Sequence, residues 1–273
     1  MLLSNVMDRL PIGRKIMAKI ICVANQKGGV GKTTTAVNLS ASLAVAERRV
    51  LLVDMDPQGN AGSGVGADKE SLTESIYDAL INDAPPASIV VETEIPFLHL
   101  LPATSDLAGA ELELASVSDR ERKLKKILAT LSGSYDYIFI DCPPSLSLLT
   151  INAMTAANSV LIPMQCEFYA MEGLSQILKT IALIQQGLNS SLSIEGILLT
   201  MFDARNNLSR QVSDEIRTHF ARETFQTVIP RNVRLSEAPS HGKPIVLYDI
   251  TSKGATSYLE LAKEIIGREA THG

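Results

Sequence analysis

Cysteine is scarce in this sequence of 273 residues, which contains only Cys22, Cys142 and Cys166. The three are widely spaced and none belongs to a CxxC pair, so neither a disulfide framework nor a cysteine-based zinc site is indicated. Each lies among apolar residues, and we therefore expect three small buried thiols.

Long membrane-type segments and targeting signals are also lacking. The longest stretch without a charged residue, from Cys142 to Cys166, contains prolines and asparagines that make it a poor membrane span. Near the N-terminus, Asp8, Arg9 and Pro11 interrupt the apolar residues, so there is no signal-peptide core. We therefore predict a cytoplasmic protein.

No internal repeat, low-complexity tract or Gly/Ser/Pro-rich linker divides the chain. With 45% hydrophobic and 20% charged residues, the composition is that of a globular protein and not of a disordered one. The net charge of −5 is unevenly spread, because acids dominate residues 66–121 whereas bases slightly outnumber acids in 200–245. Such asymmetry is compatible with a local anion-binding face on an acidic molecule.

Short aliphatic runs alternate with longer helical patterns along most of the chain. Several runs are apolar at consecutive positions, as in strands covered on both faces, and strands are predicted at Lys19–Ala24, Val50–Asp54, Leu98–Leu101, Tyr137–Asp141, Ser159–Pro163, Ile194–Thr200 and Thr224–Ile229. Helices are predicted at Thr33–Ala46, Thr73–Leu80, Arg120–Leu131, Tyr169–Gln186, Leu208–Phe220 and Ser252–Arg268. This order predicts an α/β fold that is doubly wound, a mostly parallel sheet with helices on both faces. We expect one domain over residues 19–273 after an N-terminal extension over 1–18, because Met17 could itself be a translational start.

The strongest functional signal is the segment KGGVGKTT, residues 27–34. It follows a predicted strand and opens a predicted helix, which is the context that a phosphate-binding loop requires. Its glycines allow backbone N–H groups to approach a polyphosphate, and the helix N-terminus adds its unpaired N–H groups. We expect Lys32 to neutralise β- and γ-phosphate oxygens and Thr33 to give its hydroxyl to Mg²⁺. The predicted ATP-binding residues of the loop are Lys27, Gly28, Gly29, Val30, Gly31, Lys32, Thr33 and Thr34.

The loop departs from the ordinary GxxxxGK[ST] pattern. Gln26 occupies the first glycine position, and a second lysine, Lys27, lies five residues before Lys32. In this form the segment resembles the deviant Walker A motif of the ParA/MinD group of P-loop ATPases. The resemblance implies that Lys27 reaches across a dimer interface to the partner's nucleotide, where one more fixed cation would stabilise the charge that develops during phosphoryl transfer.

Acidic residues leave the ends of two predicted strands. VLLVDMDPQ places Asp54 at the end of one strand and Asp56 just beyond it, and YIFID delivers Asp141 in a Walker B pattern. Ligands of open α/β sheets bind at this carboxyl edge, so we expect Asp141 to hold Mg²⁺ through its water shell. Asp54 and Asp56 would point to opposite faces of an extended chain and cannot share one role.

The resemblance to ParA-type ATPases, such as the Soj-like chromosome partition proteins, extends over nearly the whole chain from Lys19. VDMDPQGN is similar to the family's switch I segment and FIDCPPS to its Walker B and switch II segment. The resemblance implies that Asp56 orients the attacking water and that Asp54 lies close to the metal site. It implies a Mg²⁺ site formed by Thr33, Asp56 and Asp141, and catalytic roles for Lys27, Lys32 and Asp56.

Three later segments complete the resemblance. Residues 163–173 are similar to a ParA segment that forms an interface, and the family's adenine contacts fall here on Pro230 and Asn232. Two arginines of Soj-like proteins bind DNA non-specifically, and their positions fall on Arg205 and Arg234. A guanidinium group suits phosphate oxygens because it donates two hydrogen bonds at once. Neither arginine lies in a helix-turn-helix or aromatic-interleaved pattern, so we expect contacts to the DNA backbone without reading of bases.

The function implied by the resemblance is a Mg²⁺-dependent ATPase that dimerises around ATP, binds DNA as the ATP dimer and drives partition of a chromosome or plasmid. The implied partners are a second copy of the chain, non-specific DNA and a ParB/Spo0J-type protein that stimulates hydrolysis. The ATP-bound form would lie on the nucleoid, and no membrane partner is expected. The sequence leaves open whether the cargo is a chromosome or a plasmid.

Three other functions compete with this one. A MinD-like membrane-recruited regulator would end in a basic amphipathic helix, whereas residues 258–273 are net acidic and their apolar stripe looks core-facing. A relative of the nitrogenase iron protein would need two cysteines per subunit at a dimer interface, but the surroundings of Cys142 and Cys166 match ParA instead. A scaffold that binds nucleotide without hydrolysis is disfavoured by the presence of Lys27, Lys32, Thr33, Asp56 and Asp141.

Overall fold

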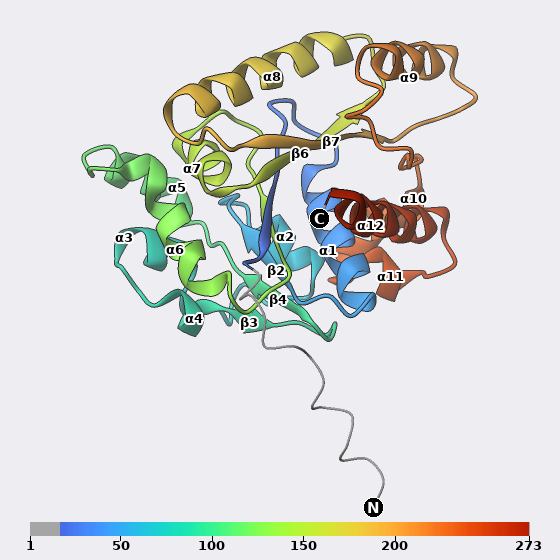
Figure 1. Ribbon diagram of the computed structural model, residues 1–273. Coiled ribbons are helices and arrows are strands. Elements are labelled where there is room, and N and C mark those ends of the chain that lie inside the picture. Colours follow the sequence, from blue (N-terminus) through green and yellow to red (C-terminus); the bar gives the residue numbers. More distant parts are fainter. Residues whose placement is uncertain (1–16, 273) are drawn as a thin grey trace, which may run out of the picture.

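The structure, a computed structural model, describes residues 17–272, so residues 1–16 of the predicted N-terminal extension lie outside the described part. Its centre is a seven-stranded sheet in the order β3-β4-β2-β5-β1-β6-β7 (Figure 1). Neighbouring strands pair in parallel except β3, which is antiparallel to β4. The strands are β1 (Lys19–Val23), β2 (Val50–Asp54), β3 (Val91–Glu92), β4 (Leu98–Leu101), β5 (Tyr137–Asp141), β6 (Ser159–Gln165) and β7 (Ser193–Thr200).

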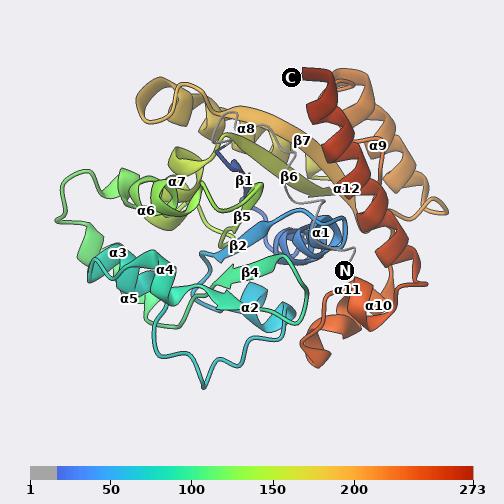
Figure 2. The ribbon, with the colours of Figure 1, turned by 60° about the horizontal axis from the view of Figure 1, so that its bottom comes forward.

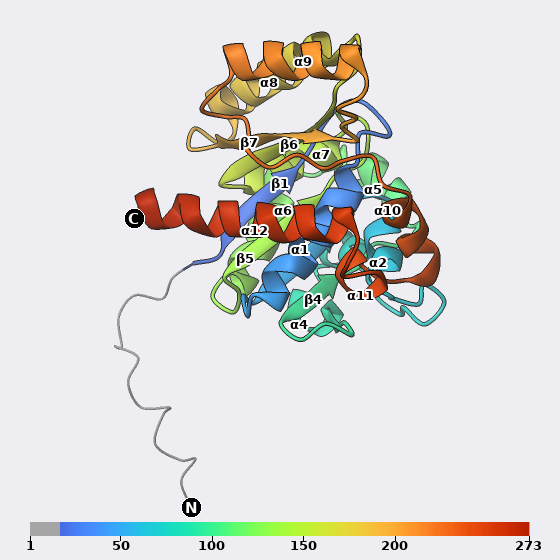
Figure 3. The ribbon, with the colours of Figure 1, turned by 90° about the vertical axis from the view of Figure 1, so that its right-hand side faces the viewer.

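Helices cover both faces of the sheet (Figures 2 and 3). One face packs against α1 (Lys32–Val45), α2 (Asn60–Gly64), α10 (Val233–Glu237), α11 (Ile245–Tyr248) and α12 (Lys253–His272). The other packs against α3 (Ile76–Ile81), α4 (Pro86–Ile89), α5 (Leu107–Leu114), α6 (Lys123–Leu131), α7 (Leu148–Ala156), α8 (Ala170–Gly187) and α9 (Asn207–His219). Strand residues alternate between the two cores: Ile138 and Ile140 of β5 enter one, and Tyr137 and Phe139 enter the other. The predicted doubly wound α/β fold is therefore confirmed.

The predicted helices are found as α1, α3, α6, α8, α9 and α12, with ends that differ by a few residues. The helix predicted from Thr73 begins only at Ile76, because Ser75 caps it: its hydroxyl accepts from the Tyr77 amide while the Asp78 carboxylate accepts from the Ser75 amide. The helix predicted from Arg120 starts as a short 3₁₀ turn, η1 (Arg120–Arg122), before α6. The sequence analysis missed several elements, of which α5 and α7 are the longest.

The strand predicted at Thr224–Ile229 is wrong. This segment runs beside β7, but within the described part of the chain it forms one isolated bridge there, Thr224 with Ile197, and a second follows just beyond both segments, Pro230 with Phe202. The amides of Gln226 and Thr227 donate to the Glu264 carboxylate of α12, at 2.9 and 3.0 Å. Because two consecutive amides turn away from β7, no continuous ladder can form.

Glu264 is therefore expected to hold this segment against α12. Burial raises the pKa of Glu264, but the hydrogen bonds from Thr227 and Gln226 and the nearby Arg268 outweigh it, so its pKa is lowered. We expect Glu264→Ala to reduce the free energy of unfolding by about 1–2 kcal/mol at pH 7, because hydrogen bonds to a charged acceptor are lost. Urea denaturation measures the change.

Two controls accompany this experiment: the pH dependence of the stability difference, and the variant Glu260→Ala. A lowered folded pKa stabilises the wild type above the unfolded value of about 4.3, and this contribution is lost as the pH falls through the folded pKa. The difference between wild type and Glu264→Ala should therefore shrink at low pH. Glu260→Ala, which removes an exposed carboxylate paired only with Lys263, should change stability by less than about 0.5 kcal/mol. Equal losses in both variants would contradict the role of Glu264.

The apolar stripe of α12 faces the core, as predicted. Tyr258, Leu261 and Ile265 are buried in the cluster that includes the apolar residues of α1, and the Tyr258 hydroxyl lies 3.2 Å from that of Thr35. The stripe is thus already covered by the protein itself. Among residues 17–272, no helix combines the length and the apolar character needed to cross a membrane.

Candidate nucleotide-binding site

The glycine-rich loop connects β1 to α1 at the carboxyl edge of the sheet. Gly29 and Gly31 have φ angles of +74° and +88°, in the left-handed region that side chains disfavour. Asn25 anchors the loop, since its side chain donates to the Pro163 carbonyl of β6 at 2.8 Å and accepts from the Lys27 amide at 2.9 Å. The Thr200 hydroxyl at the end of β7 donates to the Val30 carbonyl at 2.8 Å. These two anchors carry no motif signal, and the sequence analysis missed them.

The two lysines of the loop lie in different environments. Lys32 is buried, and its ammonium donates to the Lys27 carbonyl at 3.1 Å. Burial lowers the pKa of Lys32, while the nearby Asp141, Cys142 and Asp56 oppose that shift. By contrast, Lys27 is exposed enough to reach solvent and pairs with Glu167, just after β6, at 2.6 Å. Lys32 is therefore the lysine that faces the acids at the sheet edge.

Asp141 and Asp54 end two adjacent strands and are register partners in the β2–β5 pair. Asp141 is fully buried, and neither of its carboxylate oxygens has a hydrogen-bond partner among the described residues. Burial and the neighbouring Asp54 raise the pKa of Asp141 well above its usual value, while Thr33 and Lys32 oppose the rise. A buried carboxylate without a donor is costly unless a ligand or cation satisfies it.

Asp54 and Asp56 have separate structural roles, as expected from their spacing. Asp54 accepts from the Asp56 amide at 3.1 Å and from the Gly62 amide at 3.0 Å, so it holds the loop after β2. Burial raises the pKa of Asp54 to about 6, although these backbone donors lower it. Among the described residues, the Asp56 side chain accepts only from the Gln58 amide, at 3.0 Å, and it lies near Lys32.

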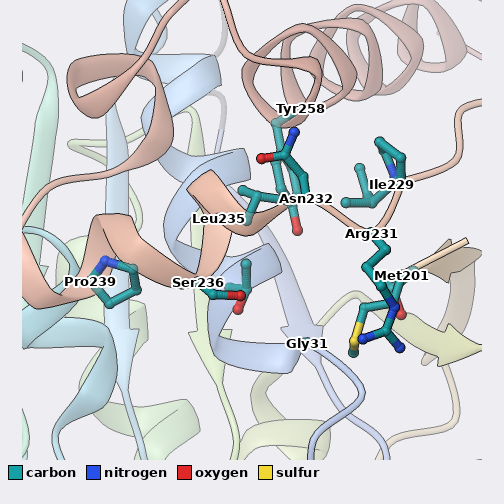
Figure 4. Close-up of a pocket in the computed structure, with 12 residues that line it drawn as sticks. Gly31, Met201, Ile229, Arg231, Asn232, Leu235, Ser236, Pro239 and Tyr258 are labelled. Carbon is teal, nitrogen blue, oxygen red and sulfur yellow. The ribbon is translucent and has the colours of Figure 1, made fainter.

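A pocket of about 330 Å³ opens beside the loop. Pro230 and Asn232, the predicted adenine contacts, are among the residues that line it. Figure 4 shows Met201 and Arg231 on the opposite side of this pocket from Pro239. Gly31 and Thr34 of the loop, two of the predicted ATP-binding residues, line the pocket as well. The sequence analysis did not identify the remaining lining residues, which are Thr200, Ile229, Leu235, Ser236 and Tyr258.

The two arginines predicted to bind DNA lie close in sequence to residues that line this pocket. Both form ion pairs with acidic side chains. Arg205 forms a two-pronged contact with Asp203, at 3.0 and 2.9 Å, which lowers the pKa of Asp203 to about 2. Arg234 pairs with Glu237 at 2.9 Å and with Asp249 at 3.5 Å. The side chain of Arg205 is nevertheless 91% exposed and that of Arg234 54% exposed.

All three cysteines are buried and free, as predicted. The sulfur atoms of Cys22 and Cys142 lie 3.3 Å apart, and burial raises the pKa of Cys166 to about 11. Within residues 17–272 no group of three or more His, Cys, Asp or Glu side chains could hold a metal ion. A Mg²⁺ site here would therefore depend on water and phosphate oxygens in addition to protein ligands.

Comparisons with known proteins identify the family. A family model described as an AAA domain matches residues 18–194. The chromosome partitioning protein ParA of Myxococcus xanthus is 59% identical over 257 residues, which cover 94% of this chain and 91% of that protein. The chain belongs to the ParA/Soj family of partition ATPases. The sporulation initiation inhibitor protein Soj of Bacillus subtilis is also 59% identical, over 91% of this chain and 98% of its own.

The ParA/Soj assignment agrees with the fold. A solved structure of cobyrinic acid a,c-diamide synthase from Mycobacterium smegmatis, with bound ADP and magnesium, superimposes with a TM-score of 0.82. It is 39% identical, and the match covers 94% of this chain and 97% of that one. This confirms the predicted family and the P-loop type of α/β fold.

Proposed function

We propose that this ParA/Soj-family protein is a Mg²⁺-dependent ATPase that dimerises around ATP, binds DNA non-specifically as the ATP dimer and drives partition with a ParB/Spo0J-type partner. The observation that carries the proposal is the buried, unpartnered Asp141 carboxylate beside Lys32 at the base of the glycine-rich loop. The ADP and magnesium bound in the structure from M. smegmatis support ATP and Mg²⁺ as the ligands.

The residues around Asp141 fit a magnesium ion. Asp141 offers two buried carboxylate oxygens without donors, Thr33 contributes a hydroxyl, and Asp56 lies close by. Mg²⁺ retains most of its water, so these three side chains would hold it mainly through its hydration shell. The bound ion supplies charge neutralisation at the β- and γ-phosphates.

Phosphate binding, orientation of the attacking water and adenine binding are assigned to different residues of the chain. The N–H groups of the loop and of the first turn of α1 bind the phosphates, and Lys32 exchanges the Lys27 carbonyl for phosphate oxygens. Asp56 orients the attacking water, since only one backbone amide engages its carboxylate. Pro230 and Asn232 hold the adenine in the adjacent pocket.

DNA binding requires the two arginines to exchange their carboxylates for phosphates. In the monomer, Asp203 and Glu237 compete with DNA for Arg205 and Arg234, so a single copy should bind weakly. A dimer doubles the number of phosphate contacts, which strengthens binding and makes it steeply dependent on salt. ATP-driven dimerisation would in this way control the affinity for DNA.

The experiment that tests the proposal measures affinity for unrelated DNA sequences against salt concentration, with no nucleotide, with ADP and with a non-hydrolysable ATP analogue. We expect tight binding only with the analogue, independent of sequence. Equal affinity in all three conditions would contradict the switch. A protein that stays monomeric with the analogue and Mg²⁺ would overturn the proposal as a whole.

Charge reversal at the arginines tests the DNA interface. We expect Arg205→Glu and Arg234→Glu each to weaken DNA binding of the ATP dimer at least about tenfold, and to lower the slope of log affinity against log salt by about 2, because each removes two contacts per dimer. Hydrolysis without partners should be largely preserved. Lys125→Glu, on α6 away from α9 and α10, is the matched control and should change neither quantity (Figure 1). Unchanged DNA binding in both arginine variants would remove them from the interface.

A further inference from the structure

The backbone and the side chain of Lys27 are held by different contacts. The Lys27 amide donates to Asn25 and its carbonyl accepts from Lys32, so the backbone of Lys27 is fixed within the loop. Its ammonium instead points to Glu167, with an Nζ–Oε2 distance of 2.6 Å. Because Lys32 is the lysine near Asp141 and Asp56, the Lys27 side chain does not serve its own phosphate site in this arrangement.

Glu167 and Lys27 form their ion pair at the protein surface. Glu167 lies two residues after the end of β6, and the Lys27 and Glu167 side chains are 41% and 46% exposed. The next two residues, Phe168 and Tyr169, are large, 76% and 65% exposed, and packed edge to face on each other. The ion pair can therefore open by rotation of side chains alone, without movement of the backbone.

We infer that Glu167 is an intramolecular latch: it holds the Lys27 ammonium on its own subunit and must release it before Lys27 can reach a partner's nucleotide. This inference rests on the proposed role of Lys27 across the dimer. Two Lys27–Glu167 ion pairs must break for each dimer that forms. These ion pairs therefore raise the ATP and protein concentrations at which dimers form. Glu167 is a positioning residue, since it acts through Lys27 and not on the nucleotide.

Dimerisation of full-length protein with a non-hydrolysable ATP analogue and Mg²⁺ tests the latch. An exposed ion pair typically changes an equilibrium by a factor of about 1.5 to 5, so loss of two latches in Glu167→Gln should tighten the dimer by about 2- to 25-fold. Sedimentation velocity over a protein titration measures this shift. The matched control is Glu260→Gln, which removes the same charge from another exposed ion pair, with Lys263 on α12, outside residues 163–173. Equal tightening in the control, no change, or weakening in Glu167→Gln would each overturn the latch.

A second measurement on nucleotide-free monomer separates the latch from the proposed function. Lys27 should react faster with limiting acetic anhydride in Glu167→Gln, by about twofold or more relative to Lys179, because the carboxylate no longer shields its amine. Glu260→Gln should react as the wild type does. If labelling rises as expected but the wild type never dimerises with the analogue, the role of Lys27 in the dimer fails while its capture by Glu167 holds. If labelling does not rise, the latch itself is refuted.

Discussion

Asp56→Ala is expected to lower the rate of ATP hydrolysis by about 100-fold or more while the ATP dimer and its DNA binding persist. The carboxylate is buried at the carboxyl end of β2, near Lys32, and only the Gln58 amide engages it. A positioned general base contributes about 10²- to 10⁴-fold to a rate, whereas it adds little to ground-state binding of the nucleotide. Phosphate release and sedimentation in the presence of ATP measure the two effects.

The same substitution at a neighbouring acid controls this result. Asp68 is exposed, and within residues 17–272 its side chain accepts only from the Glu70 amide. Asp68→Ala should therefore leave both hydrolysis and dimerisation unchanged. Loss of ATP-driven dimerisation in Asp56→Ala with hydrolysis intact would show that Asp56 does not position the water.

Lys27→Gln is expected to abolish the ATP dimer while the monomer still binds nucleotide. Its ammonium takes no part in the arrangement around Asp141, so Lys32 and the loop amides remain available to the phosphates. Removing one partner of a desolvated interfacial charge contact costs about 2 kcal/mol or more, and each dimer would lose two such contacts, which weakens it by about 1,000-fold or more. Sedimentation with the ATP analogue measures the dimer, and equilibrium dialysis measures nucleotide binding.

Lys125→Gln is the control for this prediction, because it removes an exposed lysine of α6 with the same change of charge. It should form the dimer as the wild type does. A normal ATP dimer in Lys27→Gln would mean that the second lysine of the loop does not bridge the subunits. The inferred latch on Glu167 would then have no consequence for assembly.

Local sequence sufficed for the phosphate loop and for most of the sheet. The loop is one contiguous segment, and central strands that are buried on both faces read as unbroken apolar runs, as in Tyr137–Asp141. The helix α7 was missed because nearly all of its residues are buried, which leaves no amphipathic period to detect.

The remaining features depend on residues that are remote in sequence. The segment at 224–229 has the composition of a strand, but the amides of Gln226 and Thr227 donate to Glu264 of α12 instead of to β7. Asn25, Thr200 and Glu167 acquire their contacts with the loop only when β6 and β7 are brought beside it. No single-sequence pattern marks such pairs, because the contacts are made by the fold and not by neighbours along the chain.

Apart from Thr200 and Met201, the residues that line the pocket beside the loop come from the two ends of the polypeptide. Gly31 and Thr34 come from the first tenth or so of the chain, whereas residues 229–239 and Tyr258 come from its last fifth. A bound nucleotide would thus contact residues near both ends of the chain. Residues 18–194, which the AAA domain model matches, contain the phosphate loop but not residues 229–239 of the pocket. We therefore expect nucleotide binding to depend on the C-terminal part of the fold, since truncation before residue 229 would remove most of the residues that line this pocket.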